Sequence, residues 1–272
     1  MEISYSVFLG LLQGATEFLP VSSSAHLILA EYFLDLKEAG LAFDVMLHLA
    51  TLTAIAGYFR SDFLSLLSAI PTPAAGGIQQ ARQRMLAFYL CVATLPAALL
   101  GVTLGKYAES ILRSPLLVIF TLSGAGAILW WAEKIGRRER GLESIGGRDA
   151  MIIGCAQAIA LIPGVSRSGA TMSAGLLLGL DRTAAARFSF LLSSPILLGA
   201  GGYKILELFR GPGLADGQIS FFLVGFLAAI ISGYGFIGFL MKFVQTQSLA
   251  VFAYYRFCLS TVVAMAIFFG GY

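Results

Sequence analysis

Residues 16–26 read TEFLPVSSSAH and gather polar side chains inside an apolar region. Gln13 and Glu17 are four residues apart, so they share one helical face, and their oxygens suit a divalent cation such as Mg²⁺ or Ca²⁺. Ser23 and His26 are three residues apart on the next helical piece. A serine near a histidine is the pattern of an activated nucleophile. This stretch therefore predicts a metal site at Gln13 and Glu17 and a catalytic pair at Ser23 and His26.

Residues 161–171 read LIPGVSRSGAT and form a second polar stretch of the same kind. Pro20 ends one helical piece and Pro163 ends another, and serines begin the piece that follows each break. A helix N-terminus attracts anions through its free N–H groups and its dipole. We expect the two N-termini to meet around one anion, with Arg167 supplying a guanidinium suited to phosphate oxygens. The serines expected in this cradle are Ser22, Ser24, Ser166 and Ser168.

The composition indicates that the elements positioning these residues lie in a membrane. Of the 272 residues, 58% are hydrophobic and 12% are charged, whereas a soluble domain carries roughly 25% charged residues. A net charge of +3 without a basic, aromatic-interleaved stripe excludes nucleic acid as a partner. The three cysteines are far apart, which gives no metal or disulfide framework, and we expect them to be small buried residues. They are Cys91, Cys155 and Cys258.

Long apolar runs predict six transmembrane helices, because each run approaches the ~20 residues needed to cross hydrocarbon. A shorter run at 63–70 is expected to be an interfacial or loop segment. The six runs cover residues 41–59, 85–105, 115–133, 187–205, 218–241 and 249–271.

Residues 3–33 and 149–179 instead hold short apolar pieces split by the polar stretches, which predicts two re-entrant helix hairpins. The two regions resemble each other, since Gln13 matches Gln157 and VSSS matches VSRS. The chain therefore reads as a single membrane domain, residues 1–272, built from one repeat at about 1–135 and a second at about 148–272. An odd number of crossings per repeat inverts the second copy, as in many transporters. The predicted fold is an all-α polytopic membrane protein with an inverted-topology repeat.

The distribution of basic residues in the loops predicts the orientation. Lysines and arginines favour the cytoplasmic side. With both hairpins re-entrant, 11 of the loop lysines and arginines fall on one side and 5 on the other, and the first side includes the loop between the two repeats. We therefore expect both termini and the opening of the site to be extracytoplasmic. The basic residues of that loop are Lys134, Arg137, Arg138, Arg140 and Arg148.

Structural explanations compete with the functional ones. Serines in membrane helices often bond their own backbone, a histidine is commonly a core residue, and Arg167 could be a structural charge. Ionisable groups inside a membrane are costly and by default functional, which favours roles for Glu17, His26 and Arg167. His48, four residues after Asp44 on an apolar helix, is open between lining a pore and structural pairing.

The motifs QGATE (13–17), FLPVSSSAH (18–26) and PGVSRSGAT (163–171) resemble the signatures of the bacitracin-resistance type undecaprenyl-diphosphate phosphatases, and the resemblance covers nearly the whole chain. It implies a bacterial inner-membrane enzyme that hydrolyses undecaprenyl diphosphate to the monophosphate and recycles the lipid carrier of the cell wall. The resemblance also implies six spanning helices with two re-entrant pairs. Ala25 departs from the glycine of many members, and His48 from the glutamine of some.

Carried over residue by residue, the resemblance places the family's metal-site motif on Gln13 and Glu17 and its conserved serine, histidine and arginine on Ser23, His26 and Arg167. The neighbouring phosphate-binding positions fall on Ser166, Ser168, Gly169 and Thr171. We expect Ser23 to attack the terminal phosphorus, although His26 is an alternative nucleophile. A carrier of a polyprenyl phosphate or small anion is the rival function. The oligomeric state, a homodimer included, and the role of Arg256 are left open.

Overall fold

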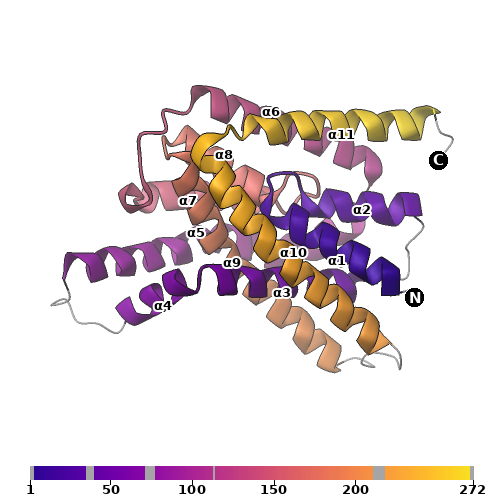
Figure 1. Ribbon diagram of the computed structural model, residues 1–272, viewed down its shortest axis with the longest axis horizontal. Coiled ribbons are helices and arrows are strands. Elements are labelled where there is room, and N and C mark those ends of the chain that lie inside the picture. Colours follow the sequence, from indigo (N-terminus) through magenta and orange to yellow (C-terminus); the bar gives the residue numbers. More distant parts are fainter. Residues whose placement is uncertain (1–2, 35–39, 71–76, 113, 211–217, 270–272) are drawn as a thin grey trace.

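Long apolar helices dominate the chain in the computed structural model (Figure 1). The structure describes residues 3–34, 40–70, 77–112, 114–210 and 218–269, and these ranges contain helices and no strand. The helices of 19 residues or more are α3 (Gly40–Tyr58), α5 (Ile78–Ile111), α6 (Pro115–Ile135), α9 (Arg182–Arg210), α10 (Gln218–Thr246) and α11 (Ala250–Phe269).

Five helices are long and apolar enough to cross a membrane by themselves, and they coincide with five of the six predicted runs. The sixth predicted run, 41–59, corresponds to α3, which qualifies only together with α4 (Arg60–Ala69). The two helices meet at an angle of 78°. The run at 63–70, expected at an interface or in a loop, is thus largely helical. The five spans are Ile78–Thr103, Pro115–Ile135, Arg182–Tyr203, Ile219–Thr246 and Ala250–Phe269.

Two broken helix pairs lie where the sequence predicts hairpins. The first consists of α1 (Ile3–Phe18) and α2 (Ser23–Leu34), and the second of α7 (Gly147–Ile159) and α8 (Arg167–Leu177). Proline lacks an N–H donor and clashes with a preceding helical turn, so Pro20 and Pro163 lie in the breaks. These helices have 16, 12, 13 and 11 residues, too short for any of them to cross the ~30 Å hydrocarbon core alone.

In each pair the second helix returns toward the start of the first. In Figure 1, α1 begins and α2 ends on the same side of the molecule, the right. In the second pair, Arg140 marks the common side. Its guanidinium bonds Asp149 in the first turn of α7 and the carbonyl oxygen of Leu178, directly after α8.

Small residues let the first helix of each pair pack closely on a spanning helix. A Cβ at Gly10 of α1 would lie 2.4 Å from the carbonyl oxygen of Gly225 in α10, and one at Gly14 would lie 2.6 Å from that of Ala229. A Cβ at Gly154 of α7 would lie 2.4 Å from the carbonyl oxygen of Ala93 in α5. Such backbone contact is typical of helix packing in membranes.

The spanning helices enclose a buried centre and expose apolar side chains outward. Helix α9 is the most buried of the five spans, whereas α5, α6, α10 and α11 carry many exposed large hydrophobic residues. The expectation that the cysteines are buried is wrong, because Cys91, Cys155 and Cys258 are all exposed. On an apolar chain of this kind, lipid can cover such side chains as well as a protein core does.

Candidate active site

In each broken pair, the segment that joins the two helices adopts the same unusual backbone geometry. Ser22 precedes α2 with φ of 75°, and Ser166 precedes α8 with φ of 70°. Positive φ is uncommon for residues other than glycine. Each serine hydroxyl accepts a hydrogen bond from the backbone N–H three residues later, from Ala25 at 3.3 Å and from Gly169 at 3.1 Å. Both helices therefore begin with the same serine cap.

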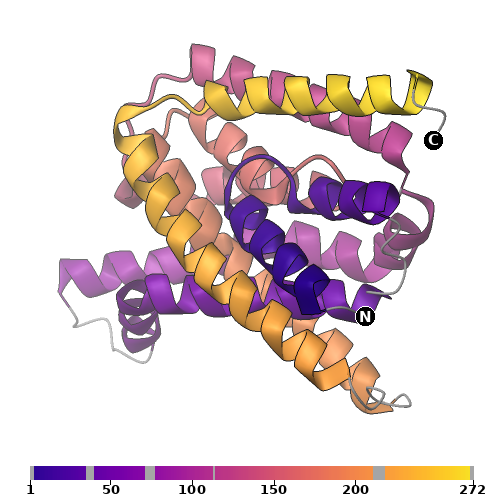
Figure 2. The same cartoon turned by 45° about the vertical axis from the view of Figure 1, so that its right-hand side comes forward.

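The two breaks lie near the middle of the molecule (Figure 2), and hydrogen bonds join them. The backbone N–H of Gly164 donates to Ser24 Oγ at 3.4 Å, and Ser168 Oγ donates to the carbonyl oxygen of Leu19 at 3.1 Å. Gly164 has φ of 91°, and a Cβ there would lie 1.9 Å from Thr121 Oγ1, so only glycine fits. The predicted meeting of two helix N-termini is confirmed.

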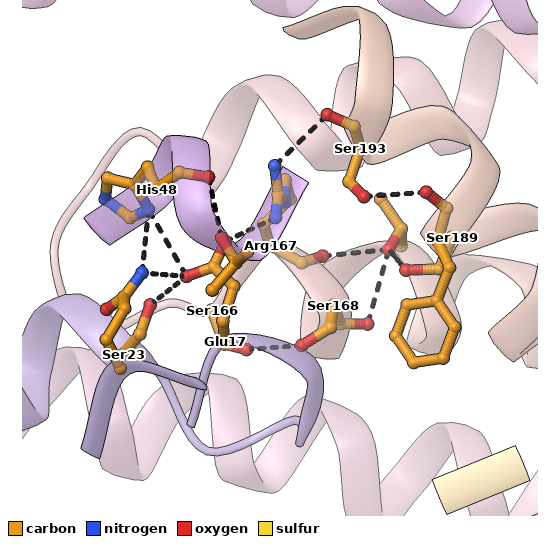
Figure 3. Close-up of polar contacts among 12 residues, drawn as sticks. Glu17, Ser23, His48, Ser166, Arg167, Ser168, Ser189 and Ser193 are labelled. Carbon is orange, nitrogen blue, oxygen red and sulfur yellow. Dashed lines mark hydrogen bonds and ion pairs between the residues drawn. The ribbon is translucent and has the colours of Figure 1, made fainter. Parts of the chain in front are cut away.

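Glu17 and Arg167 join the two broken pairs at the centre of the site (Figure 3). Arg167 Nη2 forms an ion pair with Glu17 Oε1. The side chains are 16% and 5% exposed, respectively, so water screens the pair only weakly. The carboxylate expected near an anion site is therefore neutralised by the arginine of the other pair.

Ser23, at the start of α2, reaches back across the break to Glu17. Its hydroxyl donates to Glu17 Oε2 at 2.5 Å, and Gln13 Nε2 donates to the same oxygen at 3.0 Å. A short hydrogen bond from a hydroxyl to a carboxylate is a strong, charge-assisted one. Glu17 is thus placed to accept a proton from the Ser23 hydroxyl.

Ser23 and His26, expected to form a catalytic pair, have other hydrogen-bond partners in the structure. His26 Nδ1 lies 2.7 Å from the carbonyl oxygen of Ser22, and Nε2 lies 2.7 Å from Tyr255 Oη. Both ring nitrogens therefore have partners, and the hydroxyl of Ser23 bonds Glu17. The imidazole of His26 therefore bonds the Ser22 carbonyl and Tyr255 of α11, and it is not placed to take a proton from Ser23.

His48 lies at the site, with its side chain 34% exposed. Its Nδ1 accepts a hydrogen bond from Gln13 Nε2 at 2.8 Å. The same nitrogen is 3.5 Å from Glu17 Oε2 (Figure 3). His48 thus contacts two of the residues predicted to hold a cation.

Arg256 in α11 lies outside the two polar stretches, and the sequence leaves its role open. It is fully buried, and its Nε and Nη2 donate to the carbonyl oxygens of Pro20 at 2.7 Å and Val165 at 2.8 Å. One guanidinium therefore fixes both breaks. An arginine inside an apolar run was itself a signal of function. The adjacent Tyr255 carries no charge, and tyrosines are common at membrane interfaces, so its residue type alone does not indicate a role.

The remaining predicted phosphate-binding residues lie on the Arg167 side of the site. Thr171 is buried, with Oγ1 2.8 Å from the carbonyl oxygen of Arg167 and 2.6 Å from Ser189 Oγ in α9. Arg167 Nη1 donates to the carbonyl oxygen of Ser193 at 3.4 Å. These contacts hold the start of α8, with Arg167, against Ser189 and Ser193 of α9 (Figure 3).

The residues of the site fit a divalent cation that takes most of its ligands from a substrate. In the described part of the chain, no three histidine, cysteine or acidic side chains gather as a metal site. Gln13 Oε1 is buried, however, and has no hydrogen-bond partner among the described residues. Mg²⁺ is commonly bound by one or two carboxylates together with phosphates and water. Glu17 and Gln13 Oε1 are the protein ligands that such a cation would use.

Comparison with known proteins agrees with this geometry. A curated protein of Rubrobacter xylanophilus named undecaprenyl-diphosphatase is 47% identical over 268 residues, which cover 97% of this chain and 98% of the relative. Proteins of the same name from Moorella thermoacetica and Gemmatimonas aurantiaca are each 44% identical, with 98% and 97% of both chains covered, respectively. The family model described as bacitracin resistance protein BacA matches residues 6–262. The chain therefore belongs to the bacitracin resistance protein BacA family.

Proposed function

We propose that this chain hydrolyses undecaprenyl diphosphate to undecaprenyl phosphate and inorganic phosphate, the activity that its relatives are named for. The reaction recycles the lipid carrier for cell-wall synthesis, and bacitracin resistance follows from the family name. The observation that carries the proposal is the arrangement of Ser23, Glu17 and Arg167 between two converging helix N-termini.

The two helix N-termini and the buried arginine side chains can bind the negative charge of a diphosphate. The first N–H groups of a helix have no partner within it and are available to an anion. Arg256 has no ion-pair partner among the described residues, whereas Arg167 is balanced by Glu17. The centre therefore carries an uncompensated positive charge next to the breaks. We infer that the diphosphate enters between Ser22 and Ser166 while the prenyl tail lies in lipid.

In the proposed reaction, Ser23 Oγ attacks the terminal phosphorus and its proton passes to Glu17. The bond between that phosphorus and the bridging oxygen breaks, and undecaprenyl phosphate leaves. Water then attacks the phosphoserine and its protons stay on the phosphate oxygens, the serine oxygen leaves with the proton from Glu17, and inorganic phosphate is released. Arg167 and the backbone N–H groups stabilise the charge on the transferred group, which is the main task in phosphoryl transfer.

A divalent cation, Mg²⁺ or Ca²⁺, held by Glu17 and Gln13 Oε1 would neutralise charge on the phosphate oxygens when bound. In this assignment the phosphate oxygens of the substrate supply most of the other ligands of the cation. Gln13 is further held by His48, which keeps its side chain at the site.

The proposed architecture is an inverted repeat with two re-entrant pairs, and the packing supports it. Helix α1 packs on α10 as α7 packs on α5, and α3 packs on α10 as α9 packs on α5. If α1, α3 and α5 of the first repeat are matched with α7, α9 and α10 of the second, each of these contacts has a counterpart made by the matched helices. The return of each broken pair to its starting side supports re-entry.

The proposed orientation places both termini and the opening of the site outside the cytoplasm of a bacterial inner membrane. Helix α1 begins and α11 ends on the same side of the molecule (Figure 1). Arginines 138 and 182 both pair with Glu133, at the C-terminal end of α6, in the basic region assigned to the cytoplasm.

The test is phosphate release from undecaprenyl diphosphate by the purified protein in detergent. Ser23→Ala should lower the rate by about 10²-fold or more, because it removes the attacking oxygen. Ser65→Ala is the matched control, since Ser65 bonds the carbonyl oxygen of Asp62 in α4, away from the site. Normal phosphate release by folded Ser23→Ala protein would contradict the proposed nucleophile.

A second candidate is a carrier that moves a polyprenyl phosphate or small anion, and the repeated packing pattern favours it. Transport does not require the short Ser23–Glu17 hydrogen bond. Accumulation of a labelled polyprenyl phosphate on the far side of proteoliposomes without phosphate release would support the carrier. Phosphate release without movement of lipid would support the enzyme.

A further inference from the structure

Tyr255 of α11 forms a contact that the proposed reaction does not use. Its hydroxyl lies 2.7 Å from His26 Nε2, and the two rings are nearly parallel, with centroids 5.7 Å apart and an interplanar angle of 6°. His26 is buried, whereas Tyr255 is 44% exposed on the outer face of α11. The tyrosine thus covers the outward-facing edge of the imidazole.

The two partners of His26 together specify where its proton lies. A carbonyl oxygen only accepts hydrogen bonds, so Nδ1, which faces the Ser22 carbonyl oxygen at 2.7 Å, must carry hydrogen. In the neutral ring Nε2 is then the acceptor, and Tyr255 is the donor. Tyr255 therefore favours the Nδ1–H tautomer over the alternative one.

The tautomer matters because Nδ1–H holds the backbone of Ser22. The Ser22 carbonyl oxygen receives this bond and a second one from the His26 backbone N–H at 3.2 Å. Ser22 has the uncommon φ of 75°, a conformation that persists only where its surroundings stabilise it. The next residue is Ser23, whose hydroxyl this turn directs to Glu17.

We propose that Tyr255 is a positioning residue that fixes the tautomer of His26 and, through the Ser22 turn, the direction of the Ser23 hydroxyl. The effect on catalysis rests on the proposed function, in which Ser23 attacks the phosphate. The effect on the tautomer does not depend on that function. Loss of the Tyr255 hydroxyl therefore alters the state of His26 while leaving the helix and its ring packing in place.

Nitrogen NMR of the histidines tests the tautomer directly. The chain has two histidines, so [¹⁵N]histidine labelling of the whole protein in detergent gives signals from His26 and His48 alone, and His48→Gln assigns them. At about pH 8, above the ordinary histidine pKa, His26 should show the Nδ1–H tautomer. Tyr255→Phe should shift its signals toward a mixture of tautomers and lower kcat about two- to tenfold with little change in KM.

Tyr254→Phe is the matched control, because Tyr254 is the adjacent residue of α11 and its hydroxyl accepts from Trp130 Nε1 at 3.2 Å. It should leave both the His26 signals and kcat unchanged. Identical His26 signals in Tyr255→Phe and the unsubstituted protein would overturn the proposal, as would an Nε2–H tautomer in the latter. If Ser23→Ala protein kept its activity while Tyr255→Phe shifted the His26 signals, the proposed nucleophile would fail and the positioning of His26 would stand.

Discussion

Glu17 of α1 and Arg167 of α8 form an ion pair between the two broken helix pairs, although 150 positions separate them in the sequence. Removing one partner leaves the other charge buried without compensation, which costs about 3–5 kcal/mol, whereas replacing both is far less harmful. Stability and activity should therefore respond differently to substitutions at this pair.

Glu17→Gln and Arg167→Met should each lower the melting temperature in detergent, and the double variant should recover most of that loss. Activity should not recover in the double variant, because the Glu17 carboxylate that accepts the proton and the Arg167 guanidinium are both missing. Each single variant should lose about 10²-fold or more in phosphate release. Arg187→Met is the control, since Arg187 pairs with Asp62 but is 44% exposed and should cost less than about 1 kcal/mol. A double variant less stable than either single one would contradict a mutually compensating pair.

The close packing of α1 on α10 leads to a prediction about glycine. Gly10→Ala would place a Cβ 2.4 Å from the backbone oxygen of Gly225, so the helices must separate, at a cost of about 1–3 kcal/mol. Because α1 carries Glu17, activity should fall together with stability.

Gly235→Ala in α10 is the control for the glycine substitution. A Cβ there would meet no atom within 4 Å in the described part of the chain, and alanine is the better helix former. Its melting temperature should stay the same or rise. A Gly10→Ala protein as stable and active as the Gly235→Ala protein would show that close backbone contact is not required.

Local chemistry made much of the site predictable from the sequence. Pro20 and Pro163 cannot continue a helix, so the breaks and the serine caps after them follow from residue type. The likeness of the two stretches predicted that the breaks would meet, and the contacts between Gly164 and Ser24 confirm it.

Contacts that depend on a third element could not be predicted in this way. Spacing along α2 predicted a catalytic pair of Ser23 and His26, but Ser23 is the first residue of the helix and its hydroxyl bonds Glu17 across the break. Tyr255 and Arg256, which orient His26 and both breaks, come from the last helix. Tyr255 is 229 residues from His26, and Arg256 is 236 residues from Pro20 and 91 from Val165. No periodic pattern relates residues at such a separation.

The ion pair of Arg140 and Asp149 leads to a prediction about acid stability. Burial tends to raise the pKa of Asp149, but hydrogen bonds from the Arg140 side chain and the Gly146 N–H outweigh it, so the pKa lies below its ordinary value of 3.8. A lowered pKa means that the carboxylate stabilises the folded state at neutral pH, and this contribution is lost as the pH falls below 3.8.

Asp149→Asn should therefore melt at a lower temperature than the unsubstituted protein at pH 7, and the difference should shrink below about pH 4. The exposed Glu143→Gln, in the same connection, should show no such pH-dependent difference. Melting curves in detergent over a pH series would measure both. A difference that stayed constant down to pH 3 would mean that the charge of Asp149 is not what stabilises the start of α7.

The assignment of Gln13 and Glu17 to a divalent cation can be tested by adding charge. Gln13→Glu places a second carboxylate four residues from Glu17, and cation affinity rises with the charge of its ligands. The Mg²⁺ concentration that gives half-maximal phosphate release should fall roughly tenfold, equivalent to about 1.4 kcal/mol. Gln245→Glu, at an exposed position of α10, should leave that concentration unchanged. If Gln13→Glu also left it unchanged in a folded, active protein, the cation would have to bind elsewhere, and the unpartnered Gln13 Oε1 would need another explanation.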